Sequence, residues 1–217
     1  VAHSVRAGSA LDREALERGN ACYFPASVEP MLPEALSDGL CSLKPHTPRL
    51  AMVAEIAFDG AGEPGKSAFY PAVIESAGRL TYTQVHKALE LEDETARSEL
   101  REHLPMLAQA SGLARLLMRK RGSRGSLDFD LPEPKVLLNE KGEVQALQFS
   151  QRHFSNRLIE EFMIAANEAV ARHLENLGAS FLYRAHPAPD PDKLADFFTT
   201  PERNGLLTEQ PCKPGAG

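Results

Sequence analysis

The chain has 217 residues, of which 42% are hydrophobic and 25% charged, and its formal net charge is −6. This length and composition are ordinary for a globular protein with a substantial core. The acidic balance excludes a surface that is basic overall, so a nucleic-acid site would have to be a local basic channel. Since no apolar stretch approaches the roughly 18–20 residues of a membrane span and the N-terminus lacks the apolar core of a signal peptide, we expect a cytoplasmic protein without a membrane partner.

Helical and extended segments alternate in the first third of the chain. Val1–Arg6 is typical of the end of a strand, and Ser9–Gly19 of a short helix that Ser9 or Asp12 caps and Gly19 ends. Cys22-Tyr-Phe-Pro25 predicts a short extended piece. Further on, two segments alternate between apolar and polar residues around a Gly-Ala-Gly-Glu-Pro-Gly turn, which predicts a hairpin formed by Leu50–Asp59 and Ser67–Ser76.

The middle of the chain is mainly helical. Tyr82–Leu91 predicts one helix, and Glu94–Arg121 a long helical stretch that Pro105 should kink or split. A second hairpin is expected from Pro134–Asn139 and Glu143–Phe149, with its turn at Lys141-Gly142.

The strongest helical pattern begins at Ser155, a candidate cap, and runs to about Asn176. Its apolar stripe has i, i+4 spacing and comprises Leu158, Phe162, Ala166, Val170 and Leu174. After Gly178 we expect a strand over Ser180–Arg184 and a short helix over Asp190–Phe198. These elements predict an α+β fold, with a mixed or antiparallel sheet of hairpins packed by helices. We expect one domain over residues 1–198 and a poorly ordered tail over 199–217.

Motifs for chemistry are sparse. The P-loop, GxGxxG, GxSxG and HExxH patterns are absent, and the odd set of cysteines (Cys22, Cys41 and Cys212) is typical of reduced structural thiols. Asp128-Phe-Asp130 has the form of a carboxylate pair that binds Mg²⁺, although such a pair arises often by chance and a solvated loop is the simpler explanation. The basic cluster of Arg119, Lys120, Arg121 and Arg124 could contact phosphates or complement the dipole of a helix C-terminus.

Two further sets of residues are candidates with structural alternatives. Glu160 and Glu161 lie early in the strong helix, where ordinary solvation of a helix is the simpler explanation of both. Glu161 also borders the apolar stripe and could face a cleft. Tyr23 and Phe129 lie beside turns and could stack on unpaired bases, or could pack in a core.

Three parts of the chain resemble the RNB family of ribonuclease II and ribonuclease R. They occur in the family's order, with family-like spacing, and comprise Leu11–Pro25 with Pro30–Leu43, then Arg79–Val85, then Arg157–Asn167 with Leu182–Pro187. The resemblance implies an RNB-like α+β catalytic domain, truncated at both ends. It also implies processive hydrolysis of single-stranded RNA from the 3′ end, with release of nucleoside 5′-monophosphates and no preference for DNA.

The resemblance also implies roles for particular residues. Tyr23 and Phe129 would stack on the last bases, and Glu161 would contact the terminal ribose, whose 2′-OH separates RNA from DNA. Glu161 is preferred to Glu160 for its border position and its register relative to Phe129. Arg124 and Arg157 complete the expected RNA-binding set.

The sequence departs from the family where the family binds its metal. The D-x5-D-x-D-D motif that holds Mg²⁺ is absent and is expected upstream of Val1; Asp128 and Asp130 differ from it in spacing and position. The Thr-Ser-Pro-Ile-Arg-x-Tyr element is absent too. We therefore expect a parent exoribonuclease that uses Mg²⁺ and an isolated chain that is inactive. The alternatives are a non-catalytic RNB-like module that binds RNA or protein, and a stable proteolytic core with exposed apolar surface.

Overall fold

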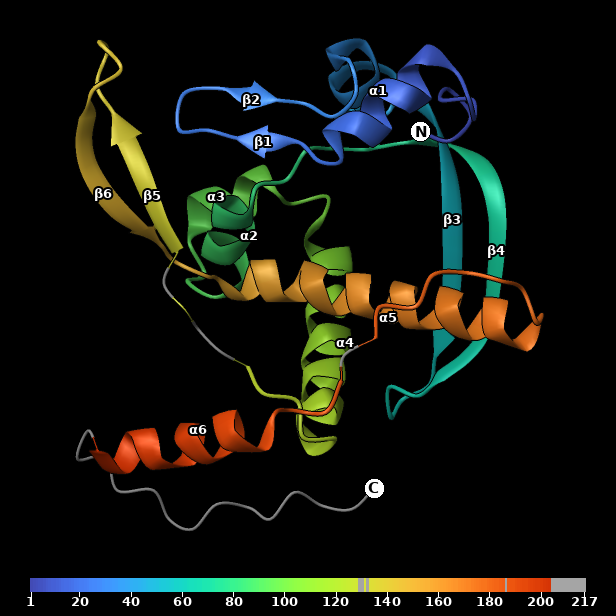
Figure 1. The fold of residues 1–217 in the computed structure, drawn as a ribbon. Coiled ribbons are helices and arrows are strands. Elements are labelled where there is room, and N and C mark those ends of the chain that lie inside the picture. Colours follow the sequence, from blue (N-terminus) through green and yellow to red (C-terminus); the bar gives the residue numbers. More distant parts are fainter. Residues whose placement is uncertain (129–130, 132, 186, 204–217) are drawn as a thin grey trace. The chain divides into compact units, whose positions relative to one another are not determined.

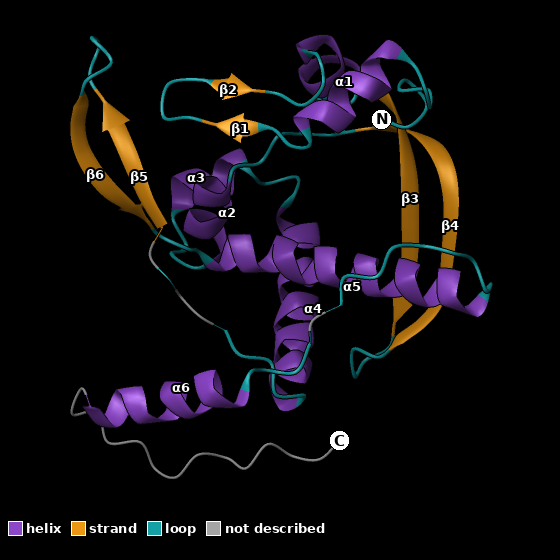
Figure 2. Cartoon of the chain, viewed as in Figure 1, coloured by secondary structure: helices purple, strands orange, loops and turns teal. Residues whose placement is uncertain are grey.

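The computed structural model describes residues 1–128, 131, 133–185 and 187–203 (Figure 1). Its contacts divide the chain into two compact units, Val1–Asn176 and the part from Leu177 onward, and each is described by itself. Helices and antiparallel two-stranded hairpins make the fold α+β, which confirms the predicted class (Figure 2).

The first unit begins with turns and a helix. Helix α1 (Ala10–Arg18) is capped by the Ser9 side chain, which accepts from the Asp12 amide at 3.2 Å, and ends at Gly19 with φ 70°, as predicted. The predicted strand over Val1–Arg6 is wrong. This segment forms turns in which the Ser4 and Val5 amides donate to the Val1 carbonyl, so these amides bond within the segment and not to a neighbouring strand.

Each sheet of the first unit is a single antiparallel hairpin. The shortest pairs β1 (Cys22–Tyr23) with β2 (Val28–Glu29), and a six-residue π-helix, η1 (Ala35–Leu40), follows it. Both predicted hairpins are confirmed: β3 (Pro48–Phe58) pairs with β4 (Pro64–Glu75), and β5 (Glu133–Leu138) pairs with β6 (Val144–Ser150).

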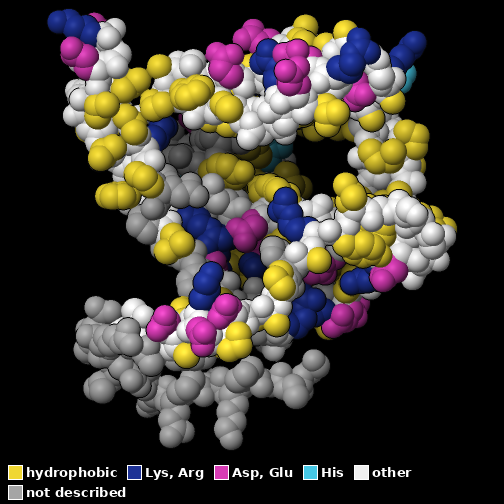
Figure 3. Space-filling view, in the orientation of Figure 1, with side chains coloured by type: hydrophobic (Ala, Val, Ile, Leu, Met, Phe, Trp, Pro, Cys, Tyr) yellow, Lys and Arg dark blue, Asp and Glu magenta, His cyan; other side chains and the backbone are white. Residues whose placement is uncertain are grey.

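The hairpins carry apolar side chains that the described residues leave uncovered. In β3–β4, Leu50 and Val73 pair across the strands and are 71% and 67% exposed. In β5–β6, Val144, Leu147 and Phe149 are exposed as well. Figure 3 shows hydrophobic side chains gathered at the surface over β5 and β6.

Three helices form the small core. They are α2 (Tyr82–Leu89), α3 (Glu94–Glu99) and α4 (Leu104–Ser123). The predicted helical stretch from Glu94 is split, as expected, and Pro105 lies in the first turn of α4, where its missing amide hydrogen costs no helical hydrogen bond. The buried apolar side chains of this cluster are Val85, Ala88, Ala96, Leu100 and Leu107.

Helix α5 (Phe154–Asn176) packs against α4, α2 and β3 (Figure 1). Its buried face includes Leu158 and Ala169, whereas Val170 of the predicted stripe is 38% exposed. The predicted capping role of Ser155 is wrong. The residue lies within the helix, and its buried hydroxyl donates to the Tyr82 carbonyl at 2.8 Å, which ties the start of α5 to the start of α2.

The second unit contains one described helix, α6 (Pro191–Arg203), which extends beyond the predicted end at Phe198. The predicted strand over Ser180–Arg184 is wrong, because this segment pairs with no strand among the described residues and Leu182 is 99% exposed. The predicted domain boundary at residue 198 falls inside α6, and 204–217 of the predicted tail lie outside the described residues. Across the part of the chain that the structure describes, no helix is long and apolar enough to cross a membrane.

Candidate functional site

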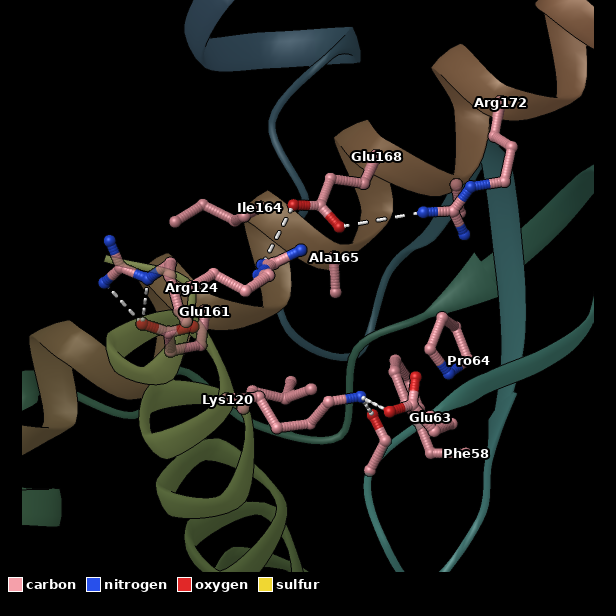
Figure 4. Close-up of a pocket in the computed structure, with 14 residues that line it drawn as sticks. Phe58, Glu63, Pro64, Lys120, Arg124, Glu161, Ile164, Ala165, Glu168 and Arg172 are labelled. Carbon is pink, nitrogen blue, oxygen red and sulfur yellow. Dashed lines mark hydrogen bonds and ion pairs between the residues drawn. The ribbon is translucent and has the colours of Figure 1, made fainter. Parts of the chain in front are cut away.

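A cleft of about 130 Å³ lies between the β3–β4 turn, the end of α4 and the middle of α5 (Figure 4). Side chains of both charges line it, together with apolar groups. The lining is Phe58, Gly62, Glu63, Pro64, Leu117, Lys120, Arg121, Arg124, Glu161, Ile164, Ala165, Glu168, Ala169 and Arg172.

The β3–β4 turn is anchored to α4 and forms one wall of the cleft. The Lys120 ammonium donates to the Gly62 carbonyl at 3.0 Å and pairs with the Glu63 carboxylate at 2.6 Å. Gly62 has φ 75°, and a Cβ there would lie 2.8 Å from Cγ of Leu116. Only glycine combines this backbone conformation with so close an approach, so the turn sequence determines the position of the wall.

The buried carboxylate of Glu161 faces the cleft from α5. Glu161 is 3% exposed, and both Nε and Nη2 of Arg121 donate to its Oε1, at 3.0 and 2.6 Å. This hydrogen bonding is the main reason why the pKa of Arg121 is raised above its ordinary value. A carboxylate so deeply buried stays charged only with such a partner, so Arg121 is part of the site.

The pair continues into an alternating chain of charges, here called the ion-pair chain. Arg121 lies 3.5 Å from Glu160, which Arg152 contacts at 2.5 Å. Arg152 also contacts Asp128 at 2.7 Å, and Arg157 contacts the other Asp128 oxygen at 2.5 Å. In order, its members are Glu161, Arg121, Glu160, Arg152, Asp128 and Arg157.

The ion-pair chain connects the end of α4, the residues after it, the link before α5 and the start of α5. Its internal bonds shift proton affinities. Hydrogen bonds to Asp128 and Glu160 raise the pKa of Arg152, while the hydrogen bond from Arg152, with Arg157 nearby, lowers the pKa of Asp128. The contacts therefore favour the ionised carboxylate of Asp128 and the protonated guanidinium of Arg152.

The structure brings together some of the predicted site residues. Arg124 and Glu161 both line the cleft, and Arg157 belongs to the adjoining ion-pair chain. Tyr23 lies in β1, in a separate hairpin, and is 80% exposed, so it does not pack in a core. Phe129 lies outside the described residues.

The two candidate glutamates occupy different surroundings. The side chain of Glu160 is 38% exposed, whereas that of Glu161 is 3% exposed. Arg124 lies 3.5 Å from Glu168, which is also 4.0 Å from Arg172, so two guanidiniums share one carboxylate at long range. These basic groups keep capacity for another anion.

Sequence reasoning missed Arg152, Glu168 and Arg172. The i, i+4 spacing of Glu168 and Arg172 was a visible signal of a pair. Arg152 gave none, because one of its partners is 24 residues away in the sequence.

The described residues do not fit the magnesium ion that the resemblance implies. Among them, no group of three or more His, Cys, Asp or Glu side chains could hold a metal. Both oxygens of Asp128 are bonded to arginines, which compete with any cation there, and Asp130 lies outside the described residues.

Comparison with known proteins decides the family. The model of the RNB domain matches residues 1–212. The chain belongs to the RNB family. Ribonuclease R of Aquifex aeolicus is 41% identical over 211 residues, a match that covers 97% of this chain and 30% of that protein. This confirms the predicted resemblance, and the RNB segment spans under a third of that relative's length.

Solved structures of RNase R are similar to this chain as well. RNase R of Mycoplasma genitalium in complex with ribose methylated single-stranded RNA has a TM-score of 0.84 and 34% identity, covering 97% of this chain and 33% of that one. The same protein has been solved with double-stranded RNA. Yeast Ssd1, a pseudonuclease, has a TM-score of 0.68 and 19% identity, covering 93% of this chain and 24% of that one, a likeness of fold alone.

Proposed function

We propose that this RNB segment is part of a processive, hydrolytic 3′-to-5′ exoribonuclease that releases nucleoside 5′-monophosphates from single-stranded RNA in the cytoplasm. One observation carries the proposal: in a chain of the RNB family, Glu161 and Arg124 line the same charged cleft. A carboxylate can accept a hydrogen bond from a ribose hydroxyl, and a guanidinium can bind the adjoining phosphate.

Each predicted residue has a proposed role. Tyr23 stacks on a terminal base, for which its high exposure leaves it available. Glu161 contacts the terminal ribose, and Arg124 a phosphate. Arg157 adds positive charge beside the cleft while one of its nitrogens pairs with Asp128. Phe129 is proposed to stack opposite Tyr23.

Catalysis is proposed to require an aspartate motif, D-x5-D-x-D-D, in the parent protein. Mg²⁺ held there would activate water and stabilise the leaving oxygen. Since the described residues offer no such group, the isolated chain should bind RNA without shortening it.

The test compares the chain with its parent on 5′-labelled single-stranded RNA, with Mg²⁺ and with EDTA. We expect shortening to mononucleotides by the parent, only with Mg²⁺, and binding alone by the chain. If the parent carries the aspartate motif but leaves RNA intact with Mg²⁺, the proposal is wrong.

The second candidate is a non-catalytic RNB-like module that binds RNA or protein. It needs no metal-binding aspartates, and both oxygens of Asp128 contact arginines instead. A parent coding sequence without the aspartate motif would support this module and exclude the exonuclease.

A further inference from the structure

Arg121 binds Glu161 in an unusual way for an arginine and a carboxylate. Two of its nitrogens converge on one oxygen, Oε1, instead of each taking its own oxygen. Within the described part of the chain, no hydrogen bond reaches Oε2. The carboxylate is therefore held from one side and keeps a second acceptor beside the cleft that it lines.

Arg121 itself is fixed. Its Nη1 donates to the Ser126 hydroxyl at 3.0 Å, its Nη2 lies 3.5 Å from Glu160, and its side chain is 19% exposed. All three guanidinium nitrogens are thus occupied by this protein's own side chains. A phosphate would have to displace these bonds, so Arg121 is poorly suited to the phosphate contact that its basic cluster suggested.

The two hydrogen bonds that Arg121 donates to Oε1 of Glu161 determine where the free oxygen, Oε2, lies. A neutral or shorter side chain at position 121 would leave Glu161 buried without a counter-charge and would remove the two hydrogen bonds that hold its carboxylate. The free oxygen would then no longer be held beside the cleft, where a ribose hydroxyl could donate to it. Lys could keep the charge but offers a point donor in place of the planar fork.

We propose that Arg121 is a positioning residue for ribose recognition, acting through Glu161. The inference rests on the proposed role of Glu161 and adds to it a second residue, on another helix, that determines how strongly RNA is distinguished from DNA.

The experiment measures the binding of 5′-labelled oligoadenylates by fluorescence anisotropy. The two probes differ only in the last nucleotide, which is ribose in one and 2′-deoxyribose in the other. We expect the unaltered protein to prefer ribose by roughly tenfold, the value of one hydrogen bond to a charged group. Arg121→Gln and Glu161→Gln should each remove most of this preference, and the double variant should lose no more than either alone.

Two further variants separate positioning from general stability. Arg121→Lys should fold and retain part of the preference, so it decides the matter if Arg121→Gln does not fold. Arg115→Gln is the matched control on the same helix. It removes an ion pair with Glu90 and a contact of the guanidinium with the Phe154 ring, 4.0 Å from its centroid, and should leave the preference unchanged.

The outcomes distinguish the inference from the proposed function. If Glu161→Gln loses the preference while Arg121→Gln and Arg121→Lys keep it in full, Arg121 is only structural and the inference is overturned. If the unaltered protein binds RNA without preferring ribose, both the inference and the role of Glu161 are wrong. If it binds neither probe, the RNA-binding function itself is contradicted.

Discussion

The charged residues at the site differ in burial, so substituting them should lower the free energy of unfolding by different amounts. Glu161→Gln leaves the guanidinium of Arg121, which is 19% exposed, without its main partner. Breaking such a pair costs about 3 kcal/mol of unfolding free energy. Glu160→Gln, at a side chain that is 38% exposed, should cost about 1 kcal/mol or less. Urea denaturation measures both, and equal losses would contradict the assigned burial.

The same pair of variants also addresses which glutamate contacts RNA. We expect Glu161→Gln to reduce the preference for a 3′-terminal ribose and Glu160→Gln to leave it intact. The reverse result would transfer the ribose contact to Glu160, the more exposed of the two.

Asp128 should make stability depend on pH. Arg152 and Arg157 lower the pKa of its carboxyl in the folded state, so the ionised form stabilises the fold above the unfolded pKa of about 4. This contribution is lost as the pH falls through the folded pKa. We therefore expect the unaltered protein to be more stable than the Asp128→Asn variant, with the largest difference at pH 7. This difference should disappear below about pH 4. A difference in melting temperature that is constant from pH 7 to pH 3 would contradict this.

At the scale of elements, the β3–β4 turn and α4 meet at a single glycine. Gly62→Ala should destabilise the protein by about 2 kcal/mol, because the new Cβ is strained at φ 75° and lies 2.8 Å from Leu116. Gly142 has φ 80° but open space around it, so Gly142→Ala reports the conformational strain alone. Thermal unfolding of the two variants should differ by the cost of the contact, and equal losses would show that the turn does not pack on α4.

For the whole molecule, the net charge of −6 contrasts with the basic groups of the cleft. If Arg124 contacts a phosphate, Arg124→Gln should lower the slope of log affinity for single-stranded RNA against log salt by about 0.7. Arg18→Gln, which breaks an exposed pair with Glu14 on α1, should leave the slope unchanged.

The uncovered hairpin faces predict how the isolated chain behaves in solution. Two-stranded hairpins are marginally stable in water unless a face is covered, and Leu50, Val73, Leu147 and Phe149 are exposed on β3–β4 and β5–β6. We expect the 217-residue chain to self-associate as its concentration rises, and light scattering would detect it. A monomer at all concentrations would count against this reading of the surface.

Sequence by itself determined the α+β class, both long hairpins, and the existence of the helices α1, α2 and α5, although not every end of them. These features depend on neighbours along the chain: alternation, i, i+4 spacing, glycine turns and a proline. The strands predicted at Val1–Arg6 and Ser180–Arg184 are wrong. A strand needs a partner strand, and the local sequence pattern does not show whether one is present. The resemblance to the RNB family was also recognisable from the amino-acid sequence alone.

Only the tertiary structure decided how the site is held. Arg121 and Glu161 are 40 residues apart, and Arg152 and Asp128 are 24 apart, so no local pattern couples them. The crossing of α4 and α5 brings the first pair together and leaves the Glu161 side chain only 3% exposed. Burial turns an ordinary helical glutamate into a charge that must be paired, and the same burial makes Arg121 part of the site.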